Sequence, residues 1–436
     1  MDETNWVVQI NEELKSDGPS LSEKEQWKRH SIYKVPSRVT ELNDKAYKPQ
    51  AVSFGPYHHG EVHLEAMEEH KHRALLHFLK RSKKPAPLQS LFLRMDQVVQ
   101  DLKDSYKPLD STWTQDTRRF LQVMIVDGCF MLEILRASCR TCTPEGYADN
   151  DPVFGEHGKL YVMPYIKRDM LMLENQLPMK VLHTLIKFET DKTQEDDESL
   201  NLLILEFFNA SSKENRSMGK CVHVLDVYRK SLIEEGRPMQ PTWYSEERGD
   251  EIIRSAIELH EAGIRFKRSK THSLRDVSFD HGVLRLPTMV VDDATEYMFL
   301  NLIAFERLHV GAGNEITSYI SFIDTIIDNE TDAAILNRRG ILINALGSDK
   351  AVAKLFNSLT KDITVDKHGF LDAVLMNMSN YCKKPWNKWR ANLIQTYFRN
   401  PWAIVSLVAA IFLFALTIVQ TIYTVAPYYQ SPSPSP

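Results

Sequence analysis

The chain has 436 residues, which is enough for two or three domains of ordinary size. Its 43% hydrophobic and 25% charged residues are typical of a folded protein and argue against a disordered one. A net charge of −5 disfavours broad nucleic-acid binding, and five cysteines are too few for a disulfide-framework protein.

The N-terminal half is predicted to be mostly helical after a polar start. Residues 1–30 are expected to be loosely ordered. No secretory signal is expected, because acidic residues come first and Gln9 and Asn11 interrupt the apolar run. The helix that contains Pro178 should be kinked or divided there. Apolar residues at helical spacing predict four helices in this half, over residues 65–81, 88–106, 119–135 and 166–186.

The second half begins with an acidic and polar loop region over 189–250, after which helical patterns resume. Alternating residues with Gly282 and Pro287 predict a small strand or hairpin over 279–291. The sequence therefore predicts a mainly α fold with short strands, as one compact multi-helix domain over 31–398. The helices expected in this half cover residues 251–262, 294–308, 316–327, 333–344, 352–359 and 373–398.

Residues 402–423 carry no charged side chain. As a helix they would extend roughly 33 Å, enough to cross a hydrocarbon core of about 30 Å. Trp402 and Tyr423 stand at the ends as interfacial anchors, and Phe412 and Leu413 lie near the centre. We therefore expect one transmembrane helix in the lipid bilayer, followed by a short Pro/Ser tail over 424–436.

The charges that flank the span predict its orientation. Lysines and arginines precede it, and no acid occurs after Asp372, so the positive-inside rule places the large N-terminal domain in the cytoplasm. We expect the plasma membrane rather than an endomembrane. Ser406 and Ala410 form a small-x-x-x-small pair, which would permit a weak homodimer through the membrane helix.

Histidines and cysteines provide two candidate metal or redox groups. Cys139 and Cys142 have redox or zinc-knuckle spacing, but no second close pair accompanies them, and the His-Glu-x-x-His arrangement is missing. Solvated or helix-capping histidines are the simpler interpretation. We assign no metal or cofactor. The clustered histidines are His58, His59, His63, His70, His72 and His77.

Carboxylates provide a third candidate group. Asp292, Asp293 and Glu296 stand close together before a helix, where capping and the helix dipole favour acids without any chemistry. We assign no catalytic residue. Asp127 and Glu174 stand instead in apolar segments, where a buried carboxylate must find donors, so we interpret them as polar links between helices of one core.

Taken together, eight segments resemble the plant-specific "domain of unknown function 247" family. The resemblance covers about residues 31–425 and implies a single-span membrane protein of land plants with a mostly helical soluble part. Similar proteins are connected with reproductive recognition and floral development, including self-incompatibility in grasses. The segments are Ser53–Gly60, Asp127–Glu133, Asp169–Pro178, Glu261–Phe266, Val291–Glu296, Asn301–Glu306, Leu346–Asp349 and Asn400–Ile404.

The leading hypothesis is a non-enzymatic, membrane-anchored protein that acts in recognition or signalling through a protein partner not yet identified. The alternative is a membrane-anchored, metal-dependent hydrolase that uses Asp292, Asp293 or Glu296. A surface receptor with its soluble part outside the cell conflicts with the flanking charges. The absence of common catalytic motifs favours the first hypothesis without excluding an enzyme.

Overall fold

The computed structural model describes most of the chain. It covers residues 7, 29–233, 255–385, 389 and 401–430, apart from residues 42, 83, 139–145, 192–193, 195, 211–216, 362 and 364–369. The predicted loosely ordered start therefore lies almost wholly outside the described residues. Cys139 and Cys142 also lie outside them.

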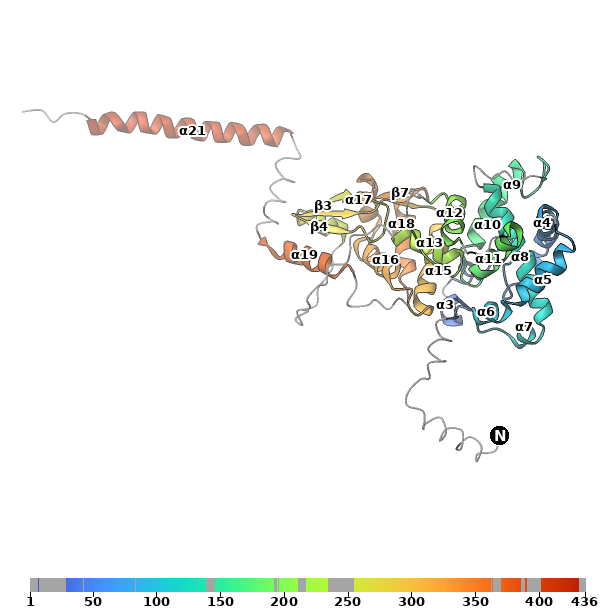
Figure 1. The fold of residues 1–436 in the computed structure, drawn as a ribbon. Helices are drawn as coiled ribbons and strands as arrows, with labels where there is room; N and C mark the ends of the chain where they lie inside the picture. Colours follow the sequence, from blue (N-terminus) through green and yellow to red (C-terminus); the bar gives the residue numbers. More distant parts are fainter. Residues whose placement is uncertain are drawn as a thin grey trace, which may run out of the picture.

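The first half of the domain is a helical bundle around one long apolar helix, α8, as the sequence predicts (Figure 1). Helices α4, α5, α11 and α12 contact α8. Gly128 of α8 lets α11 approach closely, because a Cβ there would lie 2.6 Å from Val181. The helices of this half are α4 (Ala66–Ser82), α5 (Pro87–Asp96), α6 (Val99–Asp104), α7 (Ser111–Gln115), α8 (Thr117–Ser138), α9 (Glu156–Tyr161), α10 (Met163–Asp169), α11 (Met179–Thr190) and α12 (Asp197–Phe207).

The second half combines helices with short strands. A three-stranded sheet has the order β3-β5-β4, in which β4 and β5 form the antiparallel hairpin that the sequence predicts. Strands β6 and β7 pair in parallel. The strands are β3 (Arg265–Arg268), β4 (Ser278–Asp280), β5 (Val283–Leu286), β6 (Met289–Val291) and β7 (Leu342–Asn344). The helices are α13 (Val224–Ile233), α14 (Ala256–Glu261), α15 (Thr295–Leu308), α16 (Glu315–Ile326), α17 (Glu330–Arg338), α18 (Asp349–Leu359) and α19 (Asp372–Lys383).

A short N-terminal stretch runs between the two halves. Strand β1 (Ile32–Tyr33) pairs in parallel with β2 (Tyr106–Lys107). Helix α3 (Ser37–Thr40) and the 3-10 helix η1 (Asp44–Ala46) follow, and η1 contacts α15. A second 3-10 helix, η2 (Val62–Leu64), precedes α4.

Three predicted elements need correction. The helix expected over 333–344 ends at Arg338, because Gly340 takes a left-handed φ of 67° and the chain continues into strand β7. The helix expected over 88–106 is interrupted around Val98, whose φ is −114°. The loop region expected over 189–250 contains helices α12 and α13.

The buried apolar residues form two clusters. The first includes Phe120, Phe130 and Leu185 of the α8 bundle, and the second includes Phe299, Tyr319 and Phe356 of the second half. Phe208 packs against both clusters, so the described residues place the two halves in contact. The prediction that they form one proteolytically inseparable unit stays a prediction.

Candidate functional site

Pro178 divides the helix predicted over 166–186, and the residues before it connect the two halves. Helix α10 ends at Asp169, and α11 begins at Met179. The buried Asp169 carboxylate accepts hydrogen bonds from the backbone N–H groups of Gln50, Ala51 and Val52 at 2.6–3.0 Å. Burial raises the pKa of Asp169 to about 6, and these hydrogen bonds oppose the increase. The carboxylate fixes the extended segment that carries the turn at Gly55.

The amides that follow satisfy the backbone of the same region. Asn175 accepts a hydrogen bond from the Phe54 N–H at 2.7 Å and donates to the carbonyl of Val52 at 3.0 Å. Gln176 accepts from the Leu225 N–H at 3.1 Å. Both amides are fully buried. They replace backbone pairing where the chain has left the helix.

Two contacts from this segment reach the second apolar cluster. The Glu174 carboxylate accepts a hydrogen bond from the Val35 N–H at 2.7 Å, and the Leu173 N–H donates to the Asn301 carboxamide at 2.9 Å. Asn301 also donates to the carbonyl of Ala46 at 2.8 Å. Glu174 is therefore buried and finds a donor as the sequence predicts, but it joins two segments outside the helices and not two helices.

A buried ion pair holds α8 to α4. The Lys71 ammonium lies 2.7 Å from the Asp127 carboxylate, and both side chains are essentially inaccessible to solvent. Lys71 also contacts Glu68 at 2.6 Å and donates to Ser53, while the Gly55 N–H donates to Asp127. Burial raises the pKa of Asp127, and the charge of Lys71 opposes that increase. We call Lys71, Asp127, Asp169, Glu174, Asn175 and Gln176 the polar seam.

The clustered histidines take different structural roles. His58 lies between two carboxylates, with Nδ1 2.7 Å from Glu61 Oε1 and Nε2 3.6 Å from Glu174 Oε2. Burial lowers the pKa of His58. His63 instead bonds the carbonyl of Pro49 at 3.0 Å. Among the residues that the structure describes, no group of three His, Cys, Asp or Glu side chains is close enough to hold a metal.

The acids of the hydrolase alternative do not converge. Asp292 accepts hydrogen bonds from the Ala294 N–H at 3.0 Å and the Thr295 hydroxyl at 2.8 Å, so it supports the start of α15. Asp293 is exposed. Glu296 accepts from the Ser358 hydroxyl at 3.2 Å and lines a pocket. The three carboxylates therefore serve separate partners or solvent.

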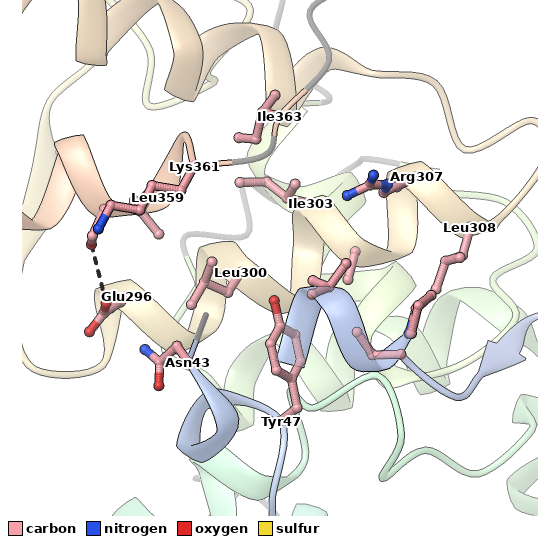
Figure 2. Close-up of a pocket in the computed structure, with 15 residues that line it drawn as sticks. Asn43, Tyr47, Glu296, Leu300, Ile303, Arg307, Leu308, Leu359, Lys361 and Ile363 are labelled. Atoms are coloured by element: carbon pink, nitrogen blue, oxygen red, sulfur yellow. Dashed lines mark hydrogen bonds between the residues drawn. The ribbon is translucent and has the colours of Figure 1, made fainter. Parts of the chain in front are cut away.

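That pocket is a candidate binding site. One face of α15 forms its floor, α3 and the segment after it form one wall, and the end of α18 with the chain beyond it forms the other (Figure 2). Its cavity volume is about 70 Å³. The apolar lining consists of Val35, Pro36, Val39, Leu300, Ile303, Ala304, Leu308, Leu359 and Ile363, and the polar lining consists of Asn43, Tyr47, Glu296, Arg307, Ser358 and Lys361.

Of the residues that line this pocket, the sequence indicates only Glu296 as a candidate site residue. The positions 296, 300, 303, 304, 307 and 308 repeat at helical spacing, which predicts a shared face of α15 but does not tell what covers it. Tyr47 and Asn43 belong to an irregular segment more than 240 residues earlier, and no local pattern places them on this face.

The C-terminal helix α21 (Pro401–Gln430) has the opposite character to the domain. Residues Val405–Ala426 are long and apolar enough to cross a membrane, and none of the most apolar window is buried. The predicted anchor residues are all exposed: Trp402 is 78%, Phe412 63%, Leu413 62% and Tyr423 77% exposed. Figure 1 shows α21 as a straight helix outside the domain.

These features define a mostly helical domain with short strands, a pocket over one face of α15 and an exposed apolar C-terminal helix. The model of the DUF247 family, described as "Plant protein of unknown function", matches residues 32–416. The chain therefore belongs to this plant family, as the motifs of the sequence indicate.

Two Arabidopsis thaliana proteins are similar to most of the chain. The UPF0481 protein At3g47200 is 30% identical over 91% of this chain and 86% of its own length. The putative UPF0481 protein At3g02645 is 23% identical over 96% of this chain and 94% of its own length. No solved structure matches the chain.

Proposed function

We propose that the protein is a non-enzymatic, membrane-anchored recognition or signalling protein. The observation that carries the proposal is the 22-residue apolar segment Val405–Ala426, which the domain leaves uncovered. Exposed apolar surface of this extent is unfavourable in water and favourable in a bilayer. A domain tethered in this way is presented to partners at the membrane surface.

The described carboxylates support the non-enzymatic part of the proposal. Asp127 and Asp169 are engaged by an ammonium and by backbone N–H groups, and Asp292 is engaged at a helix start. Residues used in this way stabilise the fold and are poor candidates for proton transfer to a substrate. A role in reproductive recognition or floral development belongs to the same proposal and rests on the family resemblance.

The orientation of the domain is part of the proposal. Basic residues flank the N-terminal side of the span, which favours a cytoplasmic domain, and we place the protein in the plasma membrane rather than an endomembrane. Protease treatment of sealed right-side-out and inside-out vesicles tests this arrangement. We expect digestion of the domain only in inside-out vesicles. Asn209, Asn215 and Asn329 stand in Asn-x-Ser/Thr glycosylation sequences, and a glycan on any of them would contradict the orientation.

The hydrolase alternative has one observation in its favour, since Glu296 lines the pocket. The purified protein tests it through metal content and through hydrolysis of generic ester and phosphoester substrates. A stoichiometric metal, together with an activity that Glu296→Gln abolishes and Asp276→Asn does not, would favour the enzyme. We expect neither the metal nor the activity.

The span itself suggests a second copy of the chain as a membrane partner. Ser406, Ala410, Thr417, Gln420 and Thr424 are spaced by three, four or seven residues and therefore share one helix face. Thr417 and Thr424 donate to backbone carbonyls of their own helix at 2.7–2.8 Å. The Gln420 carboxamide has no such bond among the described residues, and a second helix would provide one in hydrocarbon.

Crosslinking in native membranes tests this association. We expect a dimer for the natural chain and a weaker one for Gln420→Leu. Replacement of Val419 by leucine, on another face of the helix, is the matched control and should leave the dimer unchanged. Equal crosslinking of both variants would contradict the proposed face.

A further inference from the structure

A second pocket, beside the polar seam, is lined by a histidine with an unsatisfied nitrogen, and we call it the His58 pocket. The His58 side chain is only 7% exposed. Among the described residues, none forms a hydrogen bond with its Nε2 atom. Glu174 Oε2 lies 3.6 Å away, which is beyond hydrogen-bonding distance. Because a buried polar atom without a partner is unfavourable, this nitrogen is a candidate contact for a ligand.

The other ring nitrogen of His58 determines which hydrogen bond Nε2 can form. Nδ1 lies 2.7 Å from the Glu61 carboxylate, and a carboxylate accepts hydrogen bonds, so Nδ1 carries the ring proton. Burial lowers the pKa of His58, which keeps the ring neutral at neutral pH. Nε2 is then an acceptor that faces a second acceptor, Glu174 Oε2. These two atoms can share one donor from outside the chain.

The carboxylate of Glu174 favours a donor that is positively charged. Its Oε1 accepts from the Val35 N–H at 2.7 Å, yet burial still raises the pKa of Glu174, so its charged form lacks full stabilisation inside the domain. An ammonium nitrogen about 2.8 Å from both His58 Nε2 and Glu174 Oε2 would make two charge-assisted hydrogen bonds. A metal ion suits the described residues less well, because no group of three His, Cys, Asp or Glu side chains among them is close enough to hold one.

The His58 pocket also contains a positive charge that can bind an anion. Lys34 lines it, and the part of the chain that the structure describes offers no ion-pair partner to its ammonium group. The charge of Lys34 acts on the pKa of both His58 and Glu174, so it lies near the two acceptors. Lys48 lines the pocket as well, but it is paired with Asp44 at 2.7 Å. Lys34 is therefore the cation available to an anionic group of a ligand.

The size of the His58 pocket suits a small molecule. Its volume is about 430 Å³, within the range that is typical of ligand sites. Val35 and the Tyr57 ring add apolar surface to the lining. A ligand with an ammonium group, a carboxylate and a side chain of moderate size therefore fits both the charges and the volume.

We propose that the His58 pocket binds a free α-amino acid, whose ammonium group donates to His58 and Glu174 and whose carboxylate pairs with Lys34. The side chain of the amino acid occupies the rest of the pocket. This ligand class deepens the recognition role proposed above and rests on that role only for its biological meaning. Binding itself requires neither the membrane nor a particular orientation of the domain.

Three small molecules test the two charges of the ligand separately. The full chain is placed in phosphatidylcholine nanodiscs, and binding is followed by ligand-observed NMR titration. L-Alanine carries both charges, ethylamine lacks its carboxylate, and propanoate lacks its ammonium group. We expect L-alanine to bind with a Kd of about 1 mM and each of the other two to bind about tenfold more weakly.

Two substitutions assign the contacts to their residues. Glu174→Gln keeps an oxygen for the Val35 N–H and turns an amide N–H donor toward His58 Nε2, so it satisfies that nitrogen from within the chain. We expect it to weaken L-alanine binding about tenfold or more. Lys34→Gln should weaken L-alanine binding about tenfold but leave ethylamine binding unchanged or tighter, because Lys34 attracts the carboxylate and repels the ammonium group.

The matched controls are Glu65→Gln and Lys45→Gln, which change the same residue types at exposed positions outside the pocket lining. Both should bind L-alanine as the natural chain does. Circular dichroism of Glu174→Gln should confirm that this variant folds. If it does not fold, the opposite responses of the two ligands to Lys34→Gln still test the site.

Four outcomes would overturn the proposal. The absence of saturable L-alanine binding would mean that solvent alone occupies the gap beside His58. Equal binding of L-alanine by folded Glu174→Gln, or equal binding of propanoate and L-alanine, would remove the role of the ammonium group. Tighter binding of L-alanylglycine than of L-alanine would assign the pocket to a peptide N-terminus. A contrary result of the vesicle digestion experiment would contradict the orientation of the domain and leave this test unaffected.

Discussion

The polar seam and helix α21 reverse the usual arrangement of a folded protein in opposite ways. In the seam, charged and amide side chains lie inside the domain, and Lys71, Asp127 and Asp169 each have hydrogen-bonded or ionic partners. In α21, large apolar side chains such as Phe412 and Leu413 lie outside without a partner from the domain. The polar groups of the seam have their partners within the chain, whereas the apolar side chains of α21 need an environment other than water to cover them.

The difference separates the residues that build the fold from those that act outside it. A buried polar group with all its partners stabilises one arrangement of the backbone and leaves little capacity for an external ligand. An apolar helix that the domain leaves uncovered implies a partner or an environment beyond the domain. The four predictions that follow test this distinction.

Removal of the charge at the centre of the seam should have the largest effect. Asp127→Asn leaves the buried Lys71 with Glu68 as its one counterion among the described residues, and the loss of one member of a buried pair typically costs about 3–5 kcal/mol. The matched control is Asp44→Asn, which breaks the exposed pair with Lys48 at 2.7 Å and should cost less than about 1 kcal/mol. Urea unfolding of the full chain, followed by tryptophan fluorescence, measures both. Equal losses would show that the seam does not stabilise the domain.

The corresponding change in α21 should act on membrane insertion and not on folding. Leu413→Arg places a charge near the centre of the span and should cost roughly 3 kcal/mol of insertion free energy. Val62→Arg is the matched control, because Val62 is also exposed, at 80%, but belongs to the domain. Resistance to alkaline carbonate extraction measures insertion. We expect only Leu413→Arg to enter the soluble fraction, and the same loss from Val62→Arg would show that the domain itself is anchored.

The pH dependence of stability should depend on His223, a buried histidine beside the seam. Its Nδ1 accepts from the Asp226 N–H at 3.2 Å, which requires that Nδ1 carries no proton, and its Nε2 donates to the Ser31 carbonyl at 3.0 Å. Burial lowers the pKa of His223 from its ordinary value of 6.5 to about 4. The folded state therefore binds fewer protons than the unfolded state between these values, and stability is lost as the pH falls.

Because of His223, the free energy of unfolding should fall by about 2–3 kcal/mol between pH 7 and pH 4. Urea unfolding of the natural chain and of His223→Gln over this range measures it. The variant should be less stable at pH 7 and should lose less stability on acidification. Parallel pH curves for the two proteins would show that His223 does not carry the dependence.

Whether the sequence predicts a feature depends on how far apart along the chain the residues that form it lie. The apolar span, helix α8 and the β4–β5 hairpin follow from local composition and periodicity, and the sequence predicts all three. Asp127 and Glu174 are recognisable as buried links because a carboxylate in an apolar segment needs donors. Their partners, Lys71 and the Val35 N–H, are 56 and 139 residues away and have no local pattern.

The pocket could not be predicted either, because its residues come from segments far apart in the chain. The helix predicted over 333–344 is wrong for a related reason, since contacts with a distant strand override its local pattern. The α15 face repeats at helical spacing, but Tyr47 reaches it from a separate segment through the contact between η1 and α15. The helix predicted over 333–344 is apolar enough to continue, yet β7 pairs with β6 from Leu342 onward. Tertiary pairing and the turn at Gly340 outweigh the local helical pattern there.

The smallest change in the free energy of unfolding is expected for Tyr47→Phe, and the sign of this change is more informative than its size. Loss of a seam group removes a satisfied partner, whereas Tyr47→Phe removes a hydroxyl that lines the pocket and for which no hydrogen bond to a described residue is found. The ligand-free domain should therefore keep its stability or gain less than about 1 kcal/mol. Tyr33→Phe is the matched control, because the Tyr33 hydroxyl donates to the His30 carbonyl at 2.7 Å and its loss should be destabilising by about 1 kcal/mol. Urea unfolding of both variants at pH 7 measures the difference. A loss for Tyr47→Phe as large as that for Tyr33→Phe would mean that the Tyr47 hydroxyl stabilises the fold.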